Sequence, residues 1–150
     1  MRYFLDTEFN GFGGALISIG LAAEHGGEDY YVALPLPDDL DPWVERHVVP
    51  YLFNVPPAFD NRLDRVAAAH DLARYLSADP DPVLVADWPE DIALLCRLLT
   101  IHATDVVDLP RLGFDYVRTP GFSTARNSAV PHNALHDARA LRDHLLALEG

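Results

Sequence analysis

The chain begins with a short apolar run that ends in two acidic residues. Asp6 and Glu8 follow Tyr3, Phe4 and Leu5, which have the character of a strand that enters a core. Burying a carboxylate is costly unless a partner offsets its charge, and alternate residues of a strand share one face. We therefore expect Asp6 and Glu8 to point the same way, either to solvent on an edge strand or into a shared site.

A second segment carries acids beside an expected strand and helix. In VLVADWPEDIALL, residues 83–95, Asp87 follows an apolar strand and Asp91 falls in the first turn of a helix. Acids at these places also have a structural explanation, because they cap helices and favour the positive end of the helix dipole. This segment therefore indicates a site only together with other acids.

The third segment is PHNALHDARALRDHLL, residues 131–146, which contains His132 and Asp137. Asp137 borders the apolar face of an expected helix. Five residues of helix turn through about 500°, so His132 can share a site with Asp137 only from the loop before that helix. Pro131 favours a non-helical approach. The alternative is a surface histidine and an unrelated helix acid.

Together, four acids and one histidine from three separate segments form a pattern with a definite chemistry. Oxygen ligands suit Mg²⁺ or Mn²⁺, and two such ions about 3.5–4 Å apart stabilise the attacking and leaving oxygens of a phosphodiester. The expected ligands are Asp6, Glu8, Asp91 and Asp137. His132 is then the residue to accept a proton from the attacking water.

The elements that must position these residues alternate along the chain. We expect strands at residues 2–9, 15–24, 29–34, 82–86 and 105–109, and helices at residues 43–52, 61–76, 89–100 and 133–148. Two glycines at 26–27 favour a hairpin between the second and third strands, and residues 110–131 are expected to form an irregular loop. This order predicts a mixed sheet flanked by helices, an α/β fold. No glycine-rich phosphate-binding motif follows a strand.

Composition limits the classes of protein. The chain has 150 residues, 49% of them hydrophobic, which suits a single domain over residues 1–150. The net charge of −12 argues against coating long nucleic acid, but not against holding a few nucleotides where metal ions supply positive charge. The single cysteine, Cys96, excludes an internal disulfide. Without an apolar stretch of membrane-spanning length or an export signal, we expect no membrane segment and a cytoplasmic protein.

The three segments resemble the motifs of the DEDDh 3′–5′ exonucleases. FLDTEF, DIALLCRLL and HNALHD match these motifs in order over most of the chain. MRYFLDTEF, LISIGLAAE and DPWVERHVVPYL are similar to a small bacterial subgroup of exoribonuclease-like domains. The resemblance implies a ribonuclease H-like fold, two Mg²⁺ or Mn²⁺ ions at the site, and release of nucleoside 5′-monophosphates from a 3′ end.

The resemblance also assigns roles to individual residues. It makes Asp6, Glu8, Asp91 and Asp137 the metal ligands and His132 the general base. Asp87 stands where many members have asparagine, so it is an auxiliary or rival ligand and a candidate substrate contact. The turn Phe9, Asn10, Gly11 and Phe12 is expected to hold the 3′ nucleotide, with Phe12 against the terminal base; Trp88 is a further stacking candidate.

Other interpretations use the same residues. His136 and Asp137 form an HD doublet, as in metal-dependent phosphohydrolases, but that fold is all-helical and the first half of this chain is rich in strands. His132 and His136 have a spacing seen in zinc sites, but no H-E-x-x-H pattern accompanies them. A non-catalytic binding module on the same fold would usually have lost some of the acids, and here all are present.

The substrate is less clearly specified by the sequence. The acidic composition favours short or single-stranded 3′ ends, and the subgroup resemblance favours RNA. A 3′–5′ exodeoxyribonuclease is the alternative, because no residue is assigned to the 2′-hydroxyl that distinguishes RNA from DNA. Relatives are often dimers, so the resemblance also implies a homodimer as a candidate assembly.

Overall fold

A mixed sheet lies at the centre of the computed structural model, which describes residues 1–109 and 111–150. Within these residues the sheet has five strands: β1 (Arg2–Phe9), β2 (Leu16–Ala23), β3 (Tyr30–Ala33), β4 (Val83–Ala86) and β7 (Gly113–Tyr116). Their order is β3-β2-β1-β4-β7. β1, β2 and β3 are antiparallel neighbours, whereas β4 is parallel to β1 and β7 is parallel to β4. The carboxyl ends of β1, β4 and β7 therefore lie at one edge.

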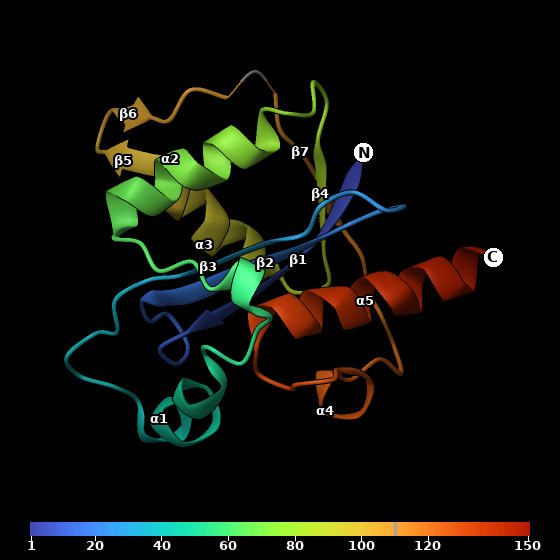
Figure 1. The fold of residues 1–150 in the computed structure, drawn as a ribbon, viewed down its shortest axis with the longest axis horizontal. Helices are drawn as coiled ribbons and strands as arrows, with labels where there is room; N and C mark the ends of the chain where they lie inside the picture. Colours follow the sequence, from blue (N-terminus) through green and yellow to red (C-terminus); the bar gives the residue numbers. More distant parts are fainter. Residues whose placement is uncertain (110) are drawn as a thin grey trace.

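Helices cover both faces of this sheet (Figure 1). The helices are α1 (Pro42–His47), α2 (Arg65–Leu76), α3 (Pro89–Leu99), α4 (Thr124–Asn127) and α5 (Ala134–Glu149), with 3₁₀ turns at Val49–Tyr51 and Pro57–Phe59. α2 and α3 pack on one face and α5 on the other. All eight residues of β2 are buried because both faces are covered. The predicted α/β layering is present.

β1 separates two apolar cores by the alternation of its side chains. Tyr3 and Leu5 pack in the core formed with α2 and α3, and Phe4 packs in the core formed with α5. Asp6 and Glu8 continue the Phe4 side, so they point to the face that α5 covers. Thr7 continues the other side, toward α3, where it is buried.

Local signals explain where two of the helices start. Asp41 caps α1, where its side chain accepts a bond from Trp43 N at 2.9 Å, and Pro42 occupies the first turn. The helix expected at residues 61–76 begins later, because Asp64 caps it and accepts from Ala67 N at 2.8 Å. The residues before this cap extend along β3, with Ala33 N donating to a main-chain carbonyl at 2.9 Å.

The strand expected at residues 105–109 is present only at two residues and lies outside the main sheet. Asp105–Val106 forms β6, which pairs with β5 (Thr100–His102) in a separate two-stranded ribbon. The fifth strand of the main sheet is β7, inside the stretch expected to be an irregular loop; Pro110 of that stretch lies outside the described residues. β7 is an edge strand with three exposed residues, so it lacks the apolar run that marks a buried strand.

None of the helices in the described part of the chain combines the length and the apolar character that crossing a bilayer requires.

Candidate active site

Asp6 and Glu8 share one face at the carboxyl end of β1, as their spacing predicts. Asp6 pairs in register with Gly20 of β2. A Cβ at Gly20 would lie 2.2 Å from the carbonyl oxygen of Ala134, so the glycine lets the backbone of α5 rest directly on the sheet. This close approach brings the start of α5 beside the two acids.

The start of α5 is built from a cap and a strained residue before it. Asn133 caps the helix by accepting from Leu135 N at 3.1 Å and His136 N at 3.3 Å. His132 lies before this cap with φ +66°, a left-handed conformation that is rare for residues other than glycine. Its N–H donates to Asp137 Oδ2 at 3.1 Å. His132 therefore approaches from the loop, as the helical geometry requires.

The tightest group at this edge consists of Glu8, His132 and Asp137. One ligand atom from each of these three residues lies within 4.8 Å of the others. Asp137 is 3% exposed, while Glu8 and His132 are half-buried. Two carboxylates and an imidazole at this separation can share a cation or a water molecule.

Asp91 reaches the same edge from the opposite face of the sheet. It lies in the first turn of α3, is 3% exposed, and accepts a hydrogen bond from the Thr7 hydroxyl at 2.6 Å. Asp87 is only half-buried, and its Oδ2 accepts from the Thr119 hydroxyl at 2.9 Å. Of the two acids in this segment, Asp91 is the one held deep in the site.

Burial and mutual repulsion raise the pKa values of the four acids. Burial raises the pKa of Glu8 to about 8, with Asp137 and Asp91 adding to the shift. Burial raises the pKa of Asp91 to about 7 and that of Asp137 to about 6, although hydrogen bonds to each oppose the shift. The pKa of Asp6 is also raised, by burial first and then by the charge of Asp91. The charges of Asp91 and Asp137 thus disfavour the ionisation of Asp6 and Glu8, and the charge of Asp87 adds to the shifts of Asp91 and Asp137.

These donors fit a divalent cation. Asp6 Oδ2 and Asp137 Oδ1 are buried and have no hydrogen-bond partner among the described residues. A buried carboxylate oxygen without a partner is costly, and an ion of charge +2 offsets both that cost and the repulsion between the acids. The donor set consists of carboxylate oxygens with one imidazole, which suits Mg²⁺ or Mn²⁺.

The His132 imidazole is poised to be neutral. Burial lowers its pKa below the usual value for histidine, and the nearby His47 lowers it further. A neutral imidazole can accept a proton. The ring also meets Trp43 of α1 edge-on, with 5.0 Å between ring centroids and 81° between the ring planes. Neither Trp43 nor His47 was expected at the site, because nothing in their local sequence pattern links them to distant His132.

The turn after Glu8 uses its residues in different ways. Phe9 is half-buried and packs against the core shared with α2 and α3. The Asn10 side chain binds the main chain just before α1. It donates through Nδ2 to Asp39 O and accepts through Oδ1 from Asp41 N, both at 2.7 Å. Its side-chain amide is thus used by the fold, and a contact of this turn with the substrate stays a prediction.

The tip of this turn is exposed. Gly11 has φ +73°, which permits the tight turn, and its N–H donates to a main-chain carbonyl within the turn at 2.9 Å. Phe12 is 93% exposed, so it makes few contacts within the chain. The alternative that Phe12 simply packs in the core does not hold.

Phe12 lies at an open hollow of about 450 Å³ that Asp87, the auxiliary ligand candidate, also lines. The other residues that line it are Trp88, Pro89, Glu90, Tyr116 and Arg118. Trp88 is 53% exposed and Tyr116 is 47% exposed. Tyr116 ends β7 and Arg118 follows it, and both were missed because this edge strand has no clear apolar pattern. The hollow thus joins Phe12 and Trp88, the two aromatic residues that the sequence selected.

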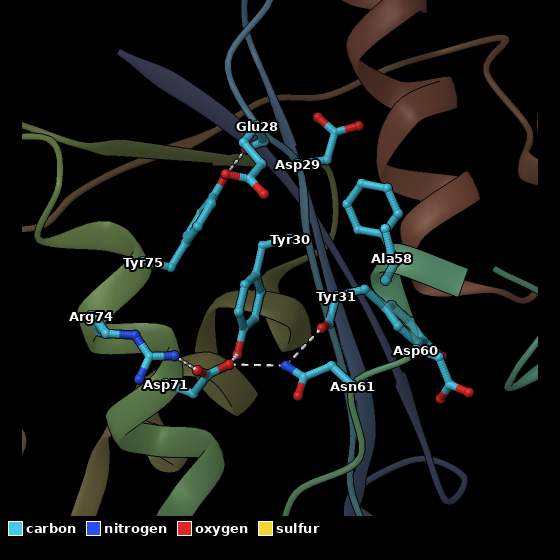
Figure 2. A pocket seen from close by; sticks show the side chains of 11 residues that line it. Glu28, Asp29, Tyr30, Tyr31, Ala58, Asp60, Asn61, Asp71, Arg74 and Tyr75 are labelled. Atoms are coloured by element: carbon cyan, nitrogen blue, oxygen red, sulfur yellow. Dashed lines mark hydrogen bonds and ion pairs between the residues drawn. The ribbon is translucent and has the colours of Figure 1, made fainter. Parts of the chain in front are cut away.

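A different hollow, of about 430 Å³, lies between β3 and α2, and none of the candidate ligands lines it (Figure 2). Asp71 accepts there from the Tyr30 hydroxyl and from Asn61 Nδ2, both at 2.9 Å, and pairs with Arg74. Tyr75 donates to a carbonyl of the turn between β2 and β3. These groups satisfy one another, so the hollow is explained by the packing of α2 beside the sheet.

The fold is similar to that of a solved structure, "Exonuclease X in complex with 5′ overhanging duplex DNA". The two chains are 14% identical, with a TM-score of 0.51, and the match covers 100% of this chain and 94% of the other. This likeness concerns the fold and confirms the predicted ribonuclease H-like mixed sheet flanked by helices. No family model matches the sequence, and no curated protein matches it significantly. Fold and site together define a ribonuclease H-like α/β domain with an acidic site at the end of its central strand.

Proposed function

We propose that this protein is a metal-dependent 3′–5′ exoribonuclease that removes nucleoside 5′-monophosphates from single-stranded or short RNA. The observation that carries the proposal is the convergence of Asp6, Glu8, Asp91 and Asp137 with His132 at one edge of the sheet. These residues come from β1, α3 and the start of α5. The resemblance of their motifs to the DEDDh exonucleases and the likeness of the fold support the same activity.

In this proposal, the four carboxylates hold two Mg²⁺ or Mn²⁺ ions. Such ions supply positive charge to the scissile phosphodiester and to the departing 3′-oxygen. Asp6 and Asp137 each offer a buried oxygen without another partner, which makes them the principal ligands. Asp91 enters from the second face with its carboxylate oriented by Thr7. Asp87 acts as an auxiliary group, since it is less buried and already binds Thr119.

His132 acts as the general base. Its lowered pKa keeps the ring neutral near pH 7, so that it can take the proton of the attacking water. The bond from its main-chain N–H to Asp137 fixes its place beside the ligand oxygens. When the leaving strand departs with a 3′-hydroxyl, the phosphate remains on the released nucleotide as a 5′-monophosphate.

The exposed aromatic residues beside the acids support a single-stranded substrate. Base stacking on an aromatic side chain contributes about 1–3 kcal/mol per base and tolerates any sequence. Phe12, Trp88 and Tyr116 offer such surfaces around one hollow, and Arg118 offers a positive charge for a phosphate. Arg118 forms no ion pair with any of the described residues, in a chain whose net charge is −12.

The choice of RNA rests on the resemblance to the exoribonuclease-like subgroup. A 3′–5′ exodeoxyribonuclease is the second candidate, favoured by the DNA in the solved structure with a similar fold. A non-catalytic module is disfavoured, because such a module has no need for four acids whose burial raises their pKa values.

The test is to incubate the purified chain with 5′-labelled single-stranded RNA and DNA of one sequence, with Mg²⁺, Mn²⁺ or EDTA. We expect a ladder of products that shorten one nucleotide at a time, only with metal, and faster on RNA. Asp137→Asn is the matched negative control. A folded protein that shortens neither strand with either metal would refute the proposal, and shortening of DNA alone would favour the second candidate.

A further inference from the structure

Trp43 contacts two histidines at the edge of the candidate active site, and the centroids of these two histidine rings lie 6.5 Å apart. Its indole meets the His132 ring edge-on, with centroids 5.0 Å apart, and lies against the His47 ring with centroids 4.8 Å apart and planes tilted by 38°. Trp43 is 52% exposed, so it forms an outer wall of the site and is not part of the core. Edge-to-face pairs of this kind prefer a definite orientation.

The His132 ring has few other contacts to orient it. The main chain of His132 is fixed by the left-handed φ of +66° and by the bond from its N–H to Asp137. Among residues 1–109 and 111–150, however, neither ring nitrogen takes part in a hydrogen bond. The imidazole is instead restrained by two aromatic neighbours, Trp43 with 5.0 Å between ring centroids and His47 with 6.5 Å, and Trp43 is the closer of the two.

The helix that carries Trp43 is anchored to the turn that follows the first two acids. The Asn10 side chain binds both Asp39 O and Asp41 N, and Asp41 in turn caps α1. The inner face of this segment is buried in one apolar cluster with Leu135 of α5, through Val44, Val48 and Leu52.

The same helical segment is anchored to the start of α5 as well. Asn133 Nδ2 donates to Tyr51 O at 2.9 Å, and His136 Nε2 donates to Asn54 O at 3.0 Å. These two residues flank the beginning of the helix that carries Asp137. α1 is thus tied to both segments that supply the Glu8, His132 and Asp137 group, and its position relative to His132 is set by the fold.

We propose that Trp43 is a positioning residue that holds the His132 imidazole toward the ligand oxygens of Glu8 and Asp137. This inference rests on the proposed function, because the value of a fixed ring lies in its alignment with the attacking water. Misplacing a reacting group by about 1 Å can reduce the rate about a hundredfold. Trp43 itself touches no reacting atom and acts only through His132.

The kinetic test compares Trp43→Leu, which removes the aromatic edge, with Trp43→Phe, which keeps one. We expect Trp43→Leu to lower kcat by about ten- to a hundredfold with KM unchanged, and Trp43→Phe to restore most of kcat. Val66→Ala, at an exposed position of α2, is the matched control and should behave as the wild type. An unchanged kcat in Trp43→Leu overturns the proposal, as does a raised KM with unchanged kcat, which would make Trp43 a substrate contact.

A second measurement is independent of nuclease activity. The Cε1–H resonance of His132, assigned by its loss in His132→Ala, should be displaced by the ring current of Trp43 in the metal-free protein. We expect this resonance to move in Trp43→Leu while the thermal unfolding of the variant stays cooperative. If the wild type cleaves no nucleic acid, the proposed function fails, but this resonance still reports whether Trp43 orients the His132 ring. A resonance that does not move in Trp43→Leu overturns the positioning role of Trp43.

Discussion

Thr7 and Asp91 share a buried hydrogen bond of 2.6 Å that joins β1 to the first turn of α3. Thr7 points to the opposite face of the sheet from Asp6 and Glu8. The bond therefore draws an acid from the second face of the sheet to the edge where the first two acids end. This is how a single strand, by alternating its side chains, brings together ligands carried by helices on both sides.

The first prediction concerns this bond. Thr7→Val keeps the shape of the side chain but leaves the buried Asp91 carboxylate without its donor. Hydrogen bonds to charged groups contribute about 1.5–3 kcal/mol, so we expect the free energy of unfolding at pH 8 to fall by about that amount. Urea denaturation measures it. Thr7→Ser retains the hydroxyl, so its free energy of unfolding should fall by less. An equal fall in the two variants would contradict the role of the hydrogen bond.

The second prediction concerns pH in the absence of metal. The folded protein holds the pKa of Glu8 at about 8, that of Asp91 at about 7 and that of Asp137 at about 6, all above their ordinary values. Between about pH 4 and pH 8 these three acids therefore bind more protons in the folded state than in the unfolded state, so their contribution to the free energy of unfolding falls as pH rises. With EDTA present, we expect Tm to fall over this interval.

Two comparisons isolate that effect. Asp137→Asn keeps an acceptor for the His132 N–H but cannot ionise, so its Tm in EDTA should fall less steeply than that of the wild type. Mn²⁺ should raise Tm more at pH 8 than at pH 5, because metal binding requires deprotonated carboxylates. A wild-type Tm that is flat over this interval, and a metal effect equal at both pH values, would both argue against a coupled acidic site.

The third prediction separates proton transfer from metal binding. A general base contributes about 10²–10⁴-fold to the rate, so His132→Ala should lose at least about a hundredfold in kcat while its Mn²⁺ affinity changes less. Asp6→Ala and Asp137→Ala should lose both kcat and Mn²⁺ affinity. Isothermal titration with Mn²⁺, beside cleavage of labelled RNA, measures the two quantities. If His132→Ala loses Mn²⁺ as completely as Asp137→Ala, the histidine is a ligand and not the base.

The fourth prediction concerns the close packing of the start of α5 against β2 at Gly20. A Cβ at Gly20 would come within 2.5 Å of three main-chain atoms at the start of α5. Gly20→Ala must therefore displace the segment that carries His132 and Asp137, and overpacking of this kind costs about 1–3 kcal/mol or more. We expect reduced Tm and weakened Mn²⁺ binding. Gly113→Ala is the matched control, since its nearest contact is a side-chain methyl of Val83 at 3.3 Å, which can move.

The acids of the site could be selected from the sequence because strand alternation and helix position are local rules. The two-residue period places Asp6 and Glu8 on one face, and the turn per residue of a helix requires His132 to lie on the loop before Asp137. Both follow from backbone geometry alone. The route of Asp91 was not foreseen, because its approach from the other face depends on how α3 packs.

Contacts between distant segments set the limit of sequence analysis here. The meeting of Trp43 with His132 requires α1 to fold back over the start of α5, which no local pattern encodes. β7 was missed because an exposed edge strand has little apolar signal, and Tyr116 and Arg118 were missed with it. The Asn10 side-chain amide binds the main chain before α1, a pairing that the sequence did not indicate. Such polar pairings depend on tertiary structure.

The last prediction concerns the hollow beside the acids. If bases stack on Trp88, then Trp88→Ala should raise KM for single-stranded RNA by about tenfold, since one stacked base contributes about 1–3 kcal/mol. Arg118→Gln should also raise KM, and should reduce its dependence on salt, because one phosphate contact is lost. In both variants kcat should be little changed. Phe114→Ala, on the exposed edge strand but outside the hollow, is the control. An unchanged KM in both variants would show that the strand takes another path to the acids.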